Sequence, residues 1–253
     1  MVLNNFSLAG KTAIVTGCNT GLGQGMALAL AEAGADIVGF NVSEPDETRV
    51  GVEKLGRRFL DLRANLGDVS TIPDLVAQAK AFNGAIHILV NNAGIIRRED
   101  AIKFSEADWD DVMDLNLKSV FFLAQAVAKV YIAQGTGGKI VNIASMLSFQ
   151  GGVRVPSYTA SKSGVMGITR LLANEWASHG INVNAIAPGY MATNNTAALR
   201  ADEQRNSAIL ERIPAGRWGK PDDLAGPVVF LASPASDYVN GYTIAVDGGW
   251  LAR

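Results

Sequence analysis

The chain has 253 residues, a size that one hydrophobic core can still organise, and 48% of them are hydrophobic against 18% that are charged. This composition excludes an intrinsically disordered chain. The formal net charge of −2 gives no electrostatic reason to expect nucleic acid or an anionic membrane as a partner. Cys18 is the only cysteine, so an intramolecular disulfide is impossible, and we predict no metal site.

Residues 1–10 lack the basic region and the apolar core of a signal peptide. No apolar stretch of the sequence approaches the length that we would require of a membrane span. We therefore expect a cytoplasmic protein.

Short β-branched runs alternate with longer amphipathic segments along the whole chain. We predict strands at 12–16, 37–40, 59–62, 86–90, 139–143, 181–186 and 243–246, and helices at 21–33, 72–82, 108–132 and 157–178. The alternation predicts an α/β fold, a Rossmann-type doubly wound parallel sheet of about seven strands with helices on both faces. Since no linker or repeat interrupts the pattern, we expect residues 1–253 to form one dinucleotide-binding and catalytic domain. In such sheets ligands bind beyond the carboxyl ends of the strands.

A glycine-rich turn follows the first predicted strand. Glycines let the backbone approach a pyrophosphate at a helix start, where the helix dipole favours an anion. The spacing is G-x-x-x-G-x-G, which differs from the G-x-G-x-x-G fingerprint. Its position between a strand and an amphipathic helix predicts a dinucleotide site, not merely a tight turn. The expected cofactor contacts are Gly17, Asn19, Thr20, Gly21, Leu22 and Gly23.

The choice of cofactor depends on the end of the second strand, where an acidic residue commonly holds the adenosine ribose. Here the strand ends at Asn41, which we expect to contact the cofactor, and Glu44 follows. No Lys or Arg lies between Phe40 and Asp46 to receive a 2′-phosphate. We therefore predict NAD as the cofactor.

Three separated segments are predicted to converge at the carboxyl ends of the strands. Asn91-Asn92-Ala93-Gly94 follows the fourth strand, Ser145 follows the fifth, and a helix carries Tyr158 and Lys162 on one face, because they are four residues apart. A free phenol has a pKa of about 10, and a nearby ammonium group is expected to lower it by roughly 1–3 units, towards the range useful for proton transfer. The Ser145 hydroxyl can hold a substrate oxygen on which charge develops.

These motifs together resemble the short-chain dehydrogenase/reductase family over essentially the whole chain. The matching pieces are Thr16-Gly17-x-x-x-Gly21-x-Gly23, Asn91-Asn92-Ala93-Gly94, Asn116, Ser145, Tyr158-x-x-x-Lys162, Pro188-Gly189 and Val246-Asp247-Gly248-Gly249. The resemblance implies a catalytic tetrad of Asn116, Ser145, Tyr158 and Lys162, in which Tyr158 exchanges the proton while a hydride passes to or from the nicotinamide. It also implies cofactor contacts from Asn65, Leu66, Asn92, Ala93, Gly94, Tyr158, Lys162, Pro188, Gly189, Met191 and Thr193.

Segments 95–100, 145–152 and 189–196 resemble the members of this family that act on small sugar acids in the breakdown of pectin-derived uronates. A sugar acid needs a cation for its carboxylate, for which we expect Arg98 or Arg154, with Arg97 as the fallback. Gln150 and Asn194 are candidates for hydroxyl contacts. A ketoacyl reductase and a non-catalytic NAD-sensing protein are the alternatives, although the second would be expected to have lost tetrad members. The family also implies a homotetramer.

Overall fold

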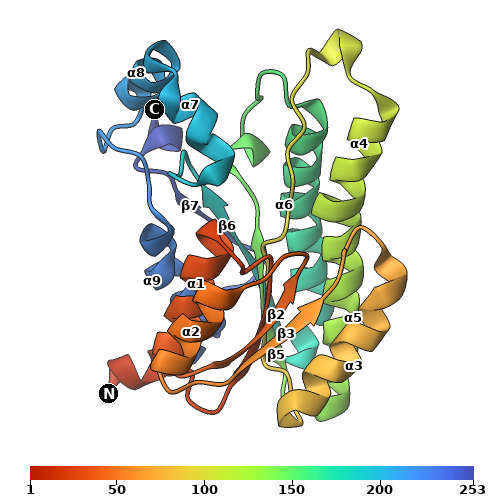
Figure 1. Cartoon of the computed structure of the whole chain (residues 1–253). Coiled ribbons are helices and arrows are strands. Elements are labelled where there is room, and N and C mark those ends of the chain that lie inside the picture. The colour runs from red at the N-terminus through yellow and green to blue at the C-terminus, as the bar shows by residue number, and fades with distance from the viewer.

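Seven parallel strands form one sheet in the computed structural model, which describes all 253 residues. The order is β3-β2-β1-β4-β5-β6-β7, and the path is traced in Figure 1. The strands are β1 Thr12–Thr16, β2 Asp36–Asn41, β3 Phe59–Arg63, β4 Ile88–Asn91, β5 Gly138–Ile143, β6 Ile181–Pro188 and β7 Thr243–Val246. The helices are α1 Gly21–Glu32, α2 Asp46–Lys54, α3 Ile72–Asn83, α4 Glu106–Met113, α5 Ser119–Gln134, α6 Pro156–Trp176, α7 Ala197–Ala201, α8 Glu203–Arg212 and α9 Ala225–Ala232.

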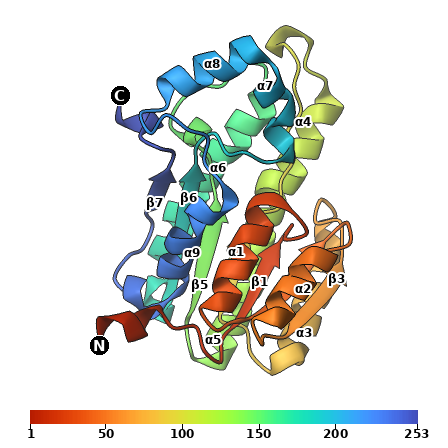
Figure 2. The same ribbon diagram turned by 60° about the vertical axis from the view of Figure 1, so that its left-hand side comes forward.

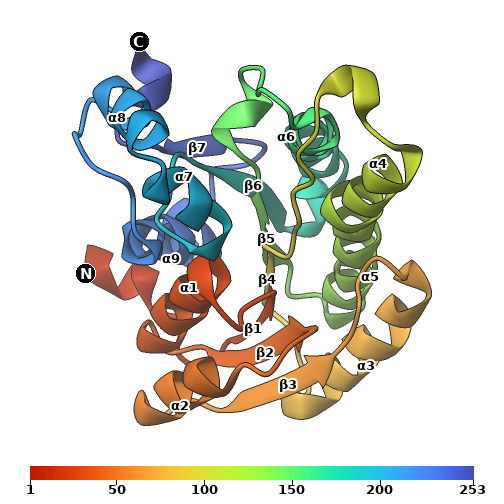
Figure 3. The same cartoon turned by 45° about the horizontal axis from the view of Figure 1, so that its top comes forward.

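Helices cover both faces of the sheet, which confirms the predicted doubly wound fold. In Figure 3, α1, α2 and α9 lie on one face, and α3, α5 and α6 lie on the other. Each face has its own apolar core: Met26 and Leu231 belong to the first, and Leu75, Leu123 and Leu172 to the second. All residues of β1 and β4 are buried, as expected for central strands that are covered on both sides.

The predicted strands are confirmed, with small shifts at their ends. The largest shifts are of two residues: the fourth strand begins at Ile88 instead of residue 86, and the sixth ends at Pro188 instead of residue 186. The sequence pattern missed α2, α7, α8 and α9. Helices α2 and α8 are rich in charged residues and bury only two and one side chains, α7 has five residues and buries none, and α9 has only eight residues and is apolar on most sides.

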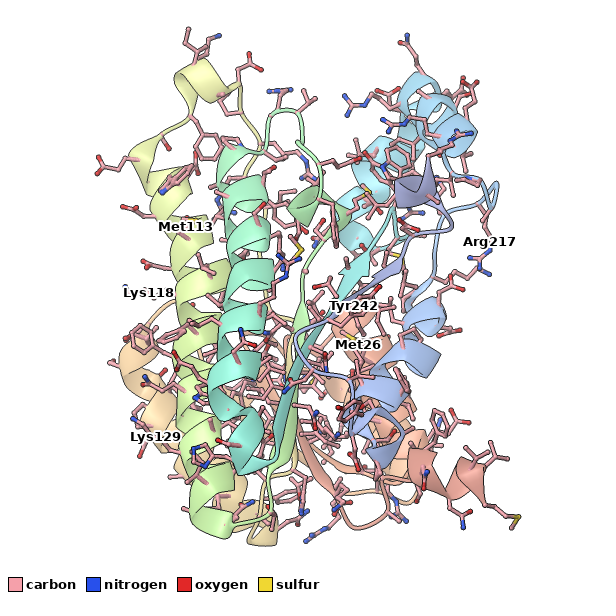
Figure 4. The ribbon with its side chains drawn as sticks, turned by 180° about the vertical axis from the view of Figure 1, so that it is seen from behind. Met26, Met113, Lys118, Lys129, Arg217 and Tyr242 are labelled. Atoms are coloured by element: carbon pink, nitrogen blue, oxygen red, sulfur yellow. The ribbon has the colours of Figure 1, made fainter.

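The helix predicted over 108–132 is interrupted. Residues Asp114–Lys118 form a π-helical turn between α4 and α5, in the segment bounded by the labelled Met113 and Lys118 in Figure 4. A π turn contains one extra residue per turn and is often found at functional sites. Asn116 lies in this turn and is completely buried.

The continuous helical run Glu106–Gln134 is long and apolar enough to cross a membrane by length and composition alone, contrary to our expectation from the sequence. In the fold it packs against α3, α6 and the sheet. The core helix of a globular protein meets the same criterion, so a single helix of this kind is weak evidence for a membrane protein.

Helices α7 and α8 lie above the carboxyl ends of the strands, as Figure 2 shows. Aromatic contacts connect this region to the chain end: the Tyr190 ring packs edge-on against Trp218 and Trp250, at centroid distances of 5.4 and 4.9 Å. Trp250 is buried, and the Arg212 guanidinium lies 4.0 Å from its ring centroid. The α7–α8 segment, through Leu199 and Ile209, therefore packs against residues that follow the ends of β6 and β7.

Candidate active site

The turn after β1 is held against the end of β4 so closely that one position tolerates no side chain. A Cβ on Gly23 would lie 2.1 Å from the Gly17 oxygen. The Asn92 amide donates hydrogen bonds to the carbonyls of Thr16 (2.9 Å) and Gly17 (3.0 Å), and the Ala93 N–H donates to the Thr16 hydroxyl (2.8 Å). The glycine-rich turn and the Asn-Asn-Ala-Gly motif are therefore one structural unit.

A cleft of about 390 Å³ opens above this unit, between the strand ends and the segment that leads into α7. Of the predicted residues, it is lined by Gly17, Asn19, Thr20, Gly21, Leu22, Gly23, Asn65, Leu66, Asn92, Ala93, Gly94, Arg98, Tyr158, Lys162, Thr193 and Asn194. Ile95, Ile96, Leu115, Asn195 and Thr196 also line it and were not anticipated. The glycine-rich turn at the start of α1 lines this cleft and fits the pyrophosphate of a dinucleotide, because the first backbone N–H groups of a helix bind anions.

Four predicted cofactor residues lie outside the lining of the cleft. Pro188 ends β6, Gly189 packs so closely on Asp247 that a Cβ would lie 2.6 Å from its Cα, and Met191 is buried. These three residues lead the chain to Thr193, which does line the cleft. The fourth, Asn41, is also buried: its Oδ1 accepts from the Cys18 N–H at 2.8 Å, and its amide donates to Asp61 at 2.8 Å.

Tyr158 and Lys162 enter the cleft from α6, as their spacing predicts. The Lys162 Nζ lies 5.7 Å from the centroid of the Tyr158 ring and donates a 2.6 Å hydrogen bond to the Ile143 carbonyl at the end of β5. Lys162 is only 5% exposed, so its ammonium group is surrounded by protein.

Burial, not the neighbouring ammonium group, dominates the titration of this pair. Desolvation raises the pKa of Tyr158 above its ordinary range, while a hydrogen bond from Ser145 and the positive charge of Arg98 act in the opposite direction. Desolvation also lowers the pKa of Lys162 to about 8. The expectation that Lys162 lowers the pKa of Tyr158 below 10 is therefore wrong for the cofactor-free fold, because loss of water outweighs the charges.

The other two predicted tetrad members are connected to this pair through serines that the sequence pattern did not identify. The Asn116 amide donates to the Ile95 carbonyl (2.9 Å) and to the Ser161 hydroxyl (3.4 Å), and Ser161 donates to the Tyr158 carbonyl (2.9 Å). Ser145 is buried beside the cleft at the start of a short helical turn, which it caps by accepting from the Leu147 N–H at 3.1 Å.

The second serine, Ser148, connects Ser145 to α6. Its hydroxyl accepts from the Ser145 N–H at 3.3 Å and donates to the Lys162 carbonyl at 2.6 Å. The three-residue spacing of Ser145 and Ser148, typical of a capping box, was the available signal for this contact.

The three candidate arginines occupy different environments. Arg154 pairs with Asp100 (3.0 Å) and Glu99 (3.5 Å), and Arg97 pairs with Asp111 (3.0 Å) and Asp108 (3.4 Å).

Arg98 lines the cleft, donates only a long 3.4 Å hydrogen bond to the Asn195 carbonyl, and is the arginine whose charge acts on Tyr158. Gln150 lies outside the cleft lining and accepts from the Trp250 indole N–H at 3.2 Å. Arg98 is therefore the best-placed cation for an anionic substrate.

A comparison with known protein families matches residues 17–251 to a family model described as enoyl-(acyl carrier protein) reductase. The chain belongs to the short-chain dehydrogenase/reductase family. It is 74% identical to a 2-dehydro-3-deoxy-D-gluconate 5-dehydrogenase of Escherichia coli over the whole of both chains. It is 56% identical to the Bacillus subtilis enzyme of the same name, over 98% of this chain and 97% of the relative.

A solved structure shows the same fold. The chain superimposes with a TM-score of 0.94 on gluconate 5-dehydrogenase from Burkholderia cenocepacia in complex with NADP and tartrate, at 39% identity over the whole of both chains. The family therefore establishes a nicotinamide-dependent oxidoreductase, and the relatives point to sugar acids.

The buried ammonium group of Lys162 yields a stability prediction. Since burial lowers its pKa from 10.5 to about 8, the unfolded chain binds more protons than the folded chain between these pH values, and this group makes stability rise with pH in that window. Lys162→Met should increase the free energy of unfolding at pH 7, by up to about 3 kcal/mol, and the gain should shrink as the pH approaches 10.5. Urea denaturation of the cofactor-free protein at pH 7 and 10 measures both effects. A less stable variant at pH 7 would contradict this account.

Proposed function

We propose that this chain interconverts 2-dehydro-3-deoxy-D-gluconate and its 2,5-dioxo counterpart by hydride transfer at C5, in the catabolism of pectin-derived uronates. The observation that carries the proposal is the meeting of Tyr158, Lys162 and Arg98 in one cleft with the dinucleotide turn. Support for the substrate comes from the full-length relatives that bear the name of this activity.

The proposed chemistry assigns a separate task to each side chain. The bound nicotinamide ring supplies the hydride acceptor or donor. During oxidation the Tyr158 oxygen takes the proton of the substrate hydroxyl, and during reduction it returns that proton. The Ser145 hydroxyl holds the substrate oxygen while its charge changes.

The remaining tetrad members act on Tyr158 and on the proton path. The Lys162 ammonium group, 5.7 Å from the centroid of the Tyr158 ring, would offset part of the desolvation cost as charge develops on the Tyr158 oxygen, and it would bind the nicotinamide ribose. Asn116 anchors a water molecule through which Lys162 exchanges its proton with solvent. The hydrogen bonds from Asn116 to Ser161 and from Ser161 to the Tyr158 backbone support this arrangement, because they fix the π turn against α6.

Gluconate 5-dehydrogenase is the second candidate activity, favoured by the likeness to the Burkholderia enzyme of that name. The two substrates are similar acids, so both would use the same cation. Initial rates on a panel that includes 2-dehydro-3-deoxy-D-gluconate, D-gluconate and 5-keto-D-gluconate, each with NAD(H) and with NADP(H), separate the two. Higher kcat/KM on D-gluconate and its keto form would replace our first assignment.

We propose NAD as the preferred cofactor, although the Burkholderia relative binds NADP. Glu44 follows β2, and no cation lies on the segment between β2 and α2. The same panel of initial rates should give a higher kcat/KM with NAD(H) than with NADP(H). Equal values for the two cofactors would defeat this part of the proposal.

We also propose a cytoplasmic homotetramer. The exposed apolar side chains of Phe122 and Ile132 on α5 and of Leu171 on α6 lie on helices whose outer sides, seen in Figure 4, no other element of the chain covers. Burying such side chains favours association between subunits. Trp250 near the chain end is buried within its own chain and adds no exposed apolar surface. The native mass in solution tests the tetramer.

Removing the Tyr158 hydroxyl should abolish most of the activity. Tyr158→Phe should fold and bind NADH normally, because the ring keeps its packing. It should lose about 10²–10⁴-fold in kcat, the usual contribution of general acid–base catalysis. Steady-state rates, together with an NADH titration, check this. If a tenth of the activity survives, the role assigned to Tyr158 is wrong.

Arg98→Ala should weaken turnover of the sugar acid at least tenfold, since a guanidinium–carboxylate hydrogen bond is worth about 1.5–3 kcal/mol. The dissociation constant for NADH should change little. Arg97→Ala is the matched control, because Arg97 is held by Asp108 and Asp111 and should affect turnover much less. The assignment fails if the Arg98 variant has unchanged kcat/KM, or if it shows an equal loss on an analogue without the carboxylate.

A further inference from the structure

A chain of polar contacts runs from the glycine-rich turn after β1 to the ends of β2 and β3. It starts at the Cys18 N–H, which donates to the Asn41 Oδ1 at 2.8 Å, and the Asn41 amide donates to Asp61 at 2.8 Å. The other oxygen of Asp61 accepts from the Arg63 Nε at 2.5 Å, and an Arg63 Nη2–Glu44 ion pair completes the chain. One guanidinium group is therefore held by two carboxylates.

This arginine lies at the edge of the sheet where the adenosine ribose of a dinucleotide is bound. Arg63 is the last residue of β3, directly beside Asn41, the last residue of β2. The cleft is lined on either side of this point by Val42 and Asn65. The cation that the segment after β2 lacks is thus supplied by the neighbouring strand.

The two carboxylates bind different parts of the guanidinium. Asp61 is largely buried and bonds to Nε, so it fixes the direction of the side chain. Glu44 bonds to Nη2 and has a side chain that is 73% exposed. An oxyanion could therefore replace Glu44 on the outer nitrogens without disturbing Asp61, because arginine binds two oxyanions through separate N–H groups.

We propose that Glu44 and Arg63 together determine which nicotinamide cofactor binds: Glu44 occupies the guanidinium that would otherwise take the 2′-phosphate of NADP. With Glu44 in place, the cluster of two carboxylates and one guanidinium repels a phosphate, and NAD is favoured. Without Glu44, Arg63 presents its free N–H groups at the ribose position. Asp61 is a positioning residue for Arg63.

The test compares equilibrium dissociation constants for NADH and NADPH, measured by cofactor fluorescence without any sugar acid. Glu44→Gln should tighten NADPH at least about tenfold, as one charge-assisted hydrogen bond can provide, and should leave NADH within about twofold. The added Arg63→Gln change, whose amide can still donate to Asp61, should abolish the gain. Competition by 2′,5′-ADP, but not by 5′-AMP, should strengthen in Glu44→Gln.

Glu47→Gln provides the matched control, because it removes an equal charge from an exposed position in the first turn of α2. It should leave both constants unchanged. Unaltered NADPH affinity in Glu44→Gln overturns the proposal. An equal gain in NADPH affinity in the variant that combines Glu44→Gln with Arg63→Gln also overturns it, because Glu44 would then act only by repulsion. The inference rests on the nicotinamide cofactor of the proposed function and not on its substrate. A protein that binds neither cofactor would contradict the proposed function itself.

Discussion

The close contact between the turn after β1 and the end of β4 is the constraint on which the rest of the site depends. Gly23 leaves no room for a Cβ between the Gly17 carbonyl and the Asn92 side chain, and the Asn92 amide satisfies the carbonyls that the turn leaves free. A buried carbonyl without a partner would be costly, so this amide is needed as much as the glycine. With the turn fixed in this way, the start of α1 faces the cleft, and the ends of the neighbouring strands provide its floor.

The electrostatics of the site follow from how deeply its groups are buried. A phenol and an ammonium group are placed where water is scarce, and each is pushed towards its neutral form, as the pKa shifts of Tyr158 and Lys162 show. At neutral pH the buried ammonium group reduces the stability of the fold, a cost that is common at functional sites. Oriented dipoles partly offset the cost, since the Ile143 carbonyl accepts from the ammonium group. Ser148 connects Ser145 to α6, and Ser161 connects Asn116 in the π turn to α6. These hydrogen bonds fix the positions of the tetrad residues relative to one another.

The sequence allowed the sheet, its parallel character and most of the cleft to be predicted, because these depend on local repeats and on residues next to strand ends. Tyr158 and Lys162 were found through their four-residue spacing, and Asn92 and Gly94 through their position after a strand. The sequence could not show the contacts between elements that lie far apart along the chain. Arg63 becomes relevant only when β3 is paired beside β2, and the orientation of Asn41 towards Asp61 depends on the same pairing. Desolvation of Tyr158 likewise depends on the packing of several segments around it.

The π turn at Asp114–Lys118 changes how the two halves of the long helix are oriented. Successive residues of an α-helix are rotated by about 100° about its axis. One additional residue in the turn therefore resets the angular phase of α4 relative to α5, so each half can present a different side to its surroundings: α4 packs on α6, whereas α5 also packs on α3 and the sheet. A single helical repeat drawn through residues 106–134 would therefore assign the wrong buried side to one of the two halves. The run is best regarded as two helical units with separate buried sides, joined by the turn that contains Asn116.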